Sequence, residues 1–136
     1  MDLIPEEIRA RLLANGKQRD RDHVPVVKLF CPFSAATWLL TELDPDDPGT
    51  IAFGLCDLGF GCPELGSVDL MEMQSVRGPG GLAVERDIHF QPRFPLSVYA
   101  EAARRQGSII EANRILAAIA VELGVGPEAT DTAGVA

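Results

Sequence analysis

The pattern of apolar and polar positions predicts a sheet in the middle of the chain. The segment at 24–30 is almost continuously apolar and rich in β-branched residues, which is typical of a buried strand. The segment at 82–90 alternates apolar and polar side chains, as a half-buried strand does. The predicted strands cover residues 24–30, 37–43, 50–55, 64–70 and 82–90. They favour a twisted antiparallel sheet of four to six strands.

Apolar residues at helical spacing lie on both sides of these strands. Near the start Ile4, Ile8 and Leu12 recur every four positions, and Gly124 ends a long amphipathic stretch near the other end. We therefore predict an α+β fold in which the opening helix and the last helix cover one face of the sheet. The predicted helices cover residues 3–15, 98–105 and 108–123.

The length of 136 residues is that of one domain. We expect residues 1–126 to form it, with a core at 24–95 and a helical extension at 97–124, and the small, polar segment 127–136 to be a disordered tail. No apolar run approaches the roughly 18 residues of a membrane helix, and the N-terminus lacks the pattern of a secretory signal. We expect a cytoplasmic protein that does not contact membranes.

The formal net charge is −8, and most of it lies in the predicted sheet region. Residues 24–90 carry ten acidic side chains and three basic ones, whereas residues 1–23 are balanced. A surface that binds nucleic-acid phosphates needs clustered Lys and Arg, so direct nucleic-acid binding is not expected. A basic protein partner, a cation or imitation of nucleic-acid charge remains open.

Acidic residues on two predicted strands suggest two alternative kinds of site. If the strands are close, Glu42, Glu85 and Asp87 would converge and bind Mg²⁺ or Mn²⁺, because hard cations prefer oxygen ligands. The other interpretation pairs these carboxylates with Arg77 and Arg86 in structural salt bridges. We favour the salt bridges, and we predict neither a catalytic residue nor a cofactor.

Arg86 is predicted to be buried, because it shares one side of its strand with Val84 and Ile88. A buried guanidinium needs a carboxylate partner. Trp38 and Glu42 lie four residues apart and are expected on one face of their strand, which makes Glu42 the candidate partner and Trp38 a stacking surface. Removal of such a pair by Arg86→Ala would cost several kcal/mol.

Several segments together resemble a known family. They are KLFCPFSAATWLLTELDPDDPGTIAFG, PELGSVDL and SVRGPGGLAVERDIHFQP, and their most specific features are the Trp38–Glu42–Asp44 spacing and the triplet at 85–87. The chain resembles an uncharacterised bacterial family, the domains of unknown function numbered 2958. This resemblance implies an α+β fold on an antiparallel sheet and an association with plasmids and other mobile elements. It implies no catalytic activity.

We therefore expect a non-enzymatic, acidic protein-interaction module of a mobile element, acting on a basic or nucleic-acid-binding defence or restriction protein. The alternative is a metal-dependent hydrolase or phosphoesterase that uses Glu42, Glu85 and Asp87. The apolar 108–123 helix also suggests a homodimer. The candidate binding residues are Trp38, Glu42, Asp44, Asp46, Asp47, Arg77, Glu85, Arg86 and Asp87.

Overall fold

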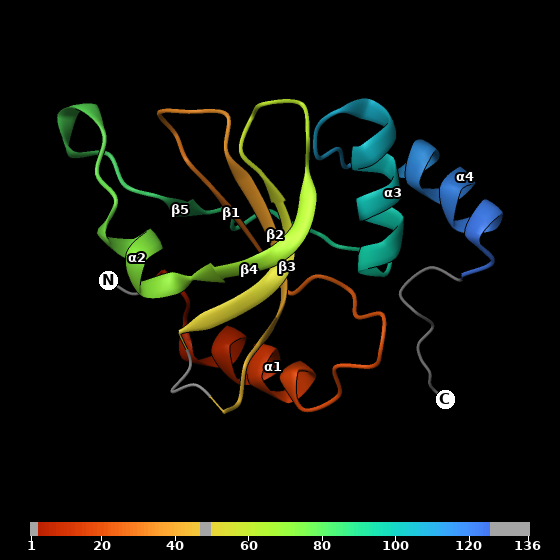
Figure 1. Ribbon diagram of the computed structural model, residues 1–136, viewed down its shortest axis with the longest axis horizontal. Coiled ribbons are helices and arrows are strands. Elements are labelled where there is room, and N and C mark those ends of the chain that lie inside the picture. The colour runs from red at the N-terminus through yellow and green to blue at the C-terminus, as the bar shows by residue number, and fades with distance from the viewer. Residues whose placement is uncertain (1–2, 47–49, 126–136) are drawn as a thin grey trace.

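A computed structural model describes residues 3–46 and 50–125 (Figure 1). An N-terminal helix is followed by a sheet and then by two C-terminal helices, which confirms the predicted α+β class. The helices are α1 (Glu6–Gly16), α2 (Leu70–Ser75), the short 3₁₀ turn η1 (Pro79–Gly81), α3 (Leu96–Gln106) and α4 (Asn113–Leu123). The strands are β1 (Val27–Phe30), β2 (Thr37–Leu43), β3 (Ile51–Asp57), β4 (Glu64–Asp69) and β5 (Glu85–Arg86).

The five strands form one antiparallel sheet in the order β4-β3-β2-β1-β5. β2 has the predicted bounds, and β3 and β4 differ from prediction by one or two residues. β1–β2, β2–β3 and β3–β4 are antiparallel pairs of strands that follow one another along the chain. β5 joins the sheet at the outer side of β1, and β4 lies at the opposite edge (Figure 1).

Helices cover both faces of the sheet. On one face, α1 and α2 pack against a buried cluster that includes Leu29, Trp38 and Leu40. On the other, α3 packs over Leu39 and Leu55, and α4 packs on the outer side of α3 (Figure 1). The prediction that the first and last helices share one face is therefore wrong. β2 is buried on both faces, so its apolar run could not show which helix covers which side.

The long strand predicted at 82–90 is also wrong, because only Glu85 and Arg86 pair with β1. The Oδ1 atom of Asp87 accepts the backbone N–H of His89 at 2.9 Å, and the backbone N–H of Phe90 bonds to the carbonyl of Asp87. An aspartate that bonds the backbone two residues on competes with a strand ladder and favours a turn. Ile88, predicted to be buried, lies in this turn and is 70% exposed.

The last helix begins five residues later than predicted. The backbone N–H of Ile109 donates to Oδ2 of Asp57 at 3.0 Å, so a side chain at the end of β3 holds the segment before α4. Asp57 is 4% exposed, and its Oδ1 also accepts the N–H of Gly59 at 2.9 Å. The predicted disordered tail at 127–136 lies outside the described residues.

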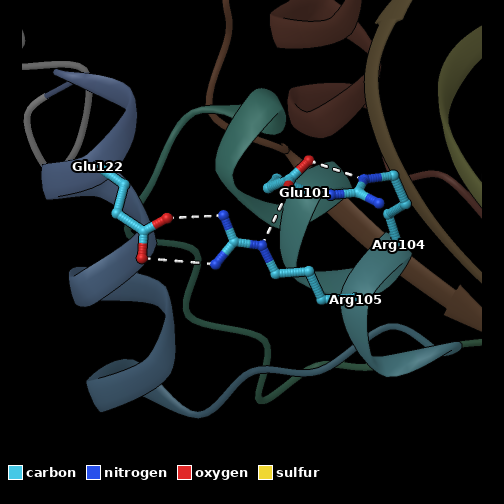
Figure 2. Close-up of polar contacts among 4 residues, drawn as sticks. All are labelled: Glu101, Arg104, Arg105 and Glu122. Atoms are coloured by element: carbon cyan, nitrogen blue, oxygen red, sulfur yellow. Dashed lines mark hydrogen bonds and ion pairs between the residues drawn. The ribbon is translucent and has the colours of Figure 1, made fainter.

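Four charged side chains tie α3 to α4 (Figure 2). Glu101 accepts Nε of Arg104 at 3.0 Å and Nε of Arg105 at 2.8 Å. The Nη2 atom of Arg105 reaches Oε1 of Glu122 on α4 at 2.7 Å. Hydrogen bonds from Arg104 and Arg105 lower the pKa of Glu101 from 4.5 to about 2. Arg105 is thus shared between a carboxylate of its own helix and one of the next.

This network predicts an acid-sensitive contact between the two helices. The pKa of Glu101 is lower in the folded chain than its ordinary value, so its contribution to stability is present above pH 4.5 and is lost as pH falls toward 2. We expect NMR titration of the Glu101 carboxyl to give a midpoint near 2, with faster amide exchange in α4 as it protonates. Glu101→Gln should remove the part of the acid dependence with a midpoint near 2, whereas Glu122, whose pKa is lowered by its hydrogen bond from Arg105, keeps its own part. A Glu101 midpoint near 4.5 would contradict the network.

Candidate functional site

A bulge in β2 separates the two residues at the centre of the predicted site. Trp38 pairs with Cys56 and Leu40 with Gly54, but Glu42 pairs with Phe53. Because side chains alternate along a strand, this shift of one residue places Glu42 on the opposite face of the sheet from Trp38. The prediction that Trp38 and Glu42 share a face is therefore wrong.

Glu42 is 7% exposed, and its partner is Arg19 rather than Arg86. The Nε atom of Arg19 lies 3.3 Å from Oε2 of Glu42, and its Nη2 lies 3.5 Å from Oδ2 of Asp44. Arg19 belongs to the charged segment between α1 and β1, which has no periodicity to place it on an element. Its only sequence signal was the charge of that segment, so sequence reasoning did not identify it.

Arg86 lies two strands away from Trp38. It pairs with Leu29, and Leu29 pairs with Trp38, so the three side chains share a face with β1 in the middle. Adjacent strands are about 4.8 Å apart, which puts Arg86 roughly 10 Å from the tryptophan strand. The Nε atom of Arg86 is buried and has no hydrogen-bond partner. The predicted pairing of Arg86 with Glu42 is not formed.

The carboxylates of the predicted metal site do not converge. Glu85 and Thr37 both pair with Phe30 of β1, so they lie at the same point along the strand direction. Glu42 lies five residues beyond Thr37 along β2, a distance of roughly 16 Å. Asp87 instead forms an ion pair with Lys28 at 3.4 Å. Within residues 3–46 and 50–125, no group of three His, Cys, Asp or Glu side chains is placed to hold a metal ion.

Lys28 holds Asp87 and Glu111 together at the edge of the sheet. Burial lowers the pKa of Lys28, but hydrogen bonds and charges from Glu111 and Asp87 outweigh this effect, and the pKa is raised above its ordinary value. Lys28 therefore stays charged at neutral pH. This contact fastens the segment before α4 to β1, and Asp87 has a structural role in it.

Two other predicted residues have local roles. Oδ1 of Asp44 accepts the backbone N–H of Asp46 at 2.9 Å, which stabilises the turn after β2. Arg77 donates from Nη1 to the carbonyls of Gln74 and Val76 at 2.7 and 2.8 Å, at the end of α2. Asp47 lies outside the described residues.

The outer edge of β4 presents unpaired backbone groups. The backbone N–H of Leu70 donates to the carbonyl of Thr50. In an antiparallel ladder, residue pairs that bond to each other alternate with pairs whose backbone groups point outward, so this bond shows which residues of β4 bond to β3. Gly66 and Val68 then bond to β3, while the backbone groups of Leu65 and Ser67 point away from the sheet. Outside the β3–β4 ladder, no described residue forms a backbone hydrogen bond with Leu65 or Ser67. An extended chain could pair here as a sixth strand.

Exposed apolar side chains lie at both ends of this edge. Phe60, in the β3–β4 turn, is 83% exposed, and Met71, at the start of α2, is 65% exposed. Leu65 is 50% exposed and lines two hollows of about 390 and 420 Å³ between the sheet and α3. Three acidic residues lie on or beside β4, namely Glu64, Asp69 and Glu72. The hollows themselves carry both signs of charge: Arg19, Arg21, Asp22 and Glu42 line one, and Glu101 and Arg104 line the other.

The family model described as "Protein of unknown function (DUF2958)" matches residues 3–110. The chain belongs to this family. The match covers α1, the whole sheet and α3, and α4 is the one element of the described residues that lies beyond it. No curated protein and no solved structure gives a significant match. None of the helices within the described ranges is long and apolar enough to cross a membrane.

Proposed function

We propose that this member of the DUF2958 family is a non-enzymatic interaction module that binds an extended, basic segment of a partner protein along β4. The observation that carries this proposal is the uncovered edge of β4, where the backbone groups of Leu65 and Ser67 point outward. Proteins that add a strand to a sheet edge use main-chain hydrogen bonds for affinity and pockets for alternate side chains for specificity. Here, Leu65 lies between two such hollows.

Charge supports a basic partner rather than a second copy of the chain. Glu64 and Asp69 lie at the two ends of β4, and Glu72 follows on α2. Two copies joined along this edge would bring these carboxylates together, and like charges that face each other are unfavourable. A segment with Lys or Arg near its ends would instead be attracted, and added salt would weaken its binding.

We further propose that the protein acts in the bacterial cytoplasm in the service of a mobile element, where the partner would be a basic defence or restriction protein. This step rests on the family resemblance.

The metal-dependent hydrolase has no supporting observation among the described residues, because Glu42 and Asp87 are engaged with Arg19 and Lys28. A homodimer through α4 remains a prediction, since Leu116 and Ile119 are buried within the chain but Val121 is exposed.

A display library of random twelve-residue peptides, screened against the whole chain, tests strand addition. We expect enriched peptides to alternate β-branched or aromatic residues with polar ones and to carry Lys or Arg. Ser67→Pro should abolish their binding, because proline removes an outward N–H and blocks pairing at an edge without breaking the β3–β4 ladder. Val121→Lys, a change at a distant exposed site on α4, should leave binding unchanged.

The outcome for Ser67→Pro decides the proposal, provided that its thermal melt shows a folded protein. Leu65→Lys is a second variant, because an edge lysine opposes strand addition and this position is already half-exposed. Peptides that bind both edge variants as tightly as the unchanged chain would show that β4 is not the binding edge.

A further inference from the structure

A cavity of about 390 Å³ opens at the other end of the sheet, beside β5. Its walls come from the segment before α1, from the end of α2 and from the chain around β5. The lining includes Leu3, Gln74, Arg77, Val84, Arg86 and Ile88. It therefore combines two guanidinium groups with three aliphatic side chains, and it lies at the sheet edge opposite β4.

The guanidinium groups in this cavity lack carboxylate partners. None of the ion pairs among the described residues involves Arg77 or Arg86. The carboxylate among the described lining residues is Glu85, which pairs with Phe30, whereas Arg86 pairs with Leu29. Alternation along β5 thus directs Glu85 to the opposite face of the sheet from Arg86.

Arg86 lines the cavity with a guanidinium that has no ion-pair partner among the described residues, and its Nε atom is buried beneath the surface without a hydrogen-bond partner. A buried donor without an acceptor loses its hydration and gains nothing in return. Arg77 is held beside it, with Nη1 on the carbonyls of Gln74 and Val76, which leaves two guanidinium nitrogens for another acceptor. An arginine fork matches two oxygens of one carboxylate or phosphate.

We propose that this cavity binds a small organic anion. Its carboxylate or phosphate oxygens would accept hydrogen bonds from Arg86 and Arg77, and its apolar body would lie against Leu3, Val84 and Ile88. Mixed lining of this kind is typical of small-molecule sites, in which apolar walls give affinity and a few polar groups fix orientation. The site is independent of strand addition at β4.

NMR titration of the whole chain with phenyl phosphate, phenylacetate, inorganic phosphate and acetate tests this assignment. We expect saturable shifts at Arg77 and at residues 84–88, with tighter binding of the two phenyl compounds than of the two simple ions. The tighter of the two phenyl compounds identifies the preferred oxyanion. Arg86→Met should weaken binding by about tenfold or more, the usual effect of losing a hydrogen bond to a charged group.

Arg114→Met is the matched control, because it makes the same change at an exposed position of α4, away from the cavity. It should leave binding unchanged. Arg86→Met should not lower the melting temperature, since it removes a buried donor that has no acceptor and keeps an unbranched side chain. Arg86→Lys keeps the charge without the fork and should also bind more weakly. The proposal is overturned if no probe gives saturable shifts, or if Arg86→Met and Arg114→Met weaken binding equally.

Discussion

Replacement of Gly54 by alanine is expected to lower the free energy of unfolding by about 3 kcal/mol, near the upper end for overpacking in a core. Gly54 lies in β3 opposite Leu40, next to the bulge of β2. A Cβ atom at this position would lie 2.0 Å from the carbonyl oxygen of Leu39 and 2.8 Å from Cα of Leu40. Both contacts are with backbone, so β2 and β3 would have to move apart.

Gly66 provides a matched control for this substitution. It pairs with Gly54 across the β3–β4 ladder, and a Cβ atom there would meet no atom within 4 Å. Gly66→Ala should therefore leave stability unchanged or raise it slightly, because alanine restricts the unfolded chain more than glycine does. Thermal melts should separate the two variants by roughly 10 °C. Equal melting temperatures would contradict the close approach of β2 and β3 beside the bulge.

The second large effect is expected for Asp57→Ala, which should cost about 3 kcal/mol. Asp57 is 4% exposed and accepts the backbone N–H groups of Gly59 and Ile109. Without the carboxylate, two donors in a partly buried region lose their acceptor, and each such loss costs about 1–3 kcal/mol. The segment before α4 would also lose its attachment to the end of β3. Urea unfolding measures the change.

Asp46→Ala is the control for Asp57→Ala, because it removes the same charge from an exposed side chain in the turn after β2. It should change the free energy of unfolding by less than about 0.5 kcal/mol. If Asp57→Ala were as mild as this control, the segment before α4 would not depend on Asp57.

Local patterns were enough to predict much of the fold. β2 was predicted with its bounds, β-branched and aromatic composition located β1 and β3 to within three residues, and alternation located β4 to within one. β1, β2 and β3 each have a neighbouring strand on both sides, so their burial agrees with their β-favouring composition. The strand predicted at 82–90 failed because the side chain of Asp87 forms a turn, which alternation does not reveal.

The candidate site was harder to predict, because it depends on pairing between distant segments. The bulge after Leu40 moves Glu42 to the other face, and one extra residue in a strand leaves no mark on its apolar pattern. Arg19 reaches Glu42 from a segment without periodicity. Arg86 was predicted to be buried beside a carboxylate partner, but the residue is only partly buried and its buried Nε atom has no partner. Its lack of a partner was not foreseen, because only the register shows that Glu42 lies elsewhere.

Hydrogen exchange at individual amides of β4 tests the central claim most directly. In the free protein, the amides of Leu65 and Ser67 should exchange quickly, while those of Gly66 and Val68, which bond to β3, should exchange slowly. When a selected basic peptide binds, Leu65 and Ser67 should become protected. Protection of Leu65 and Ser67 in the free chain, or no gain in protection on binding, would contradict the account that β4 is an open edge for a partner strand.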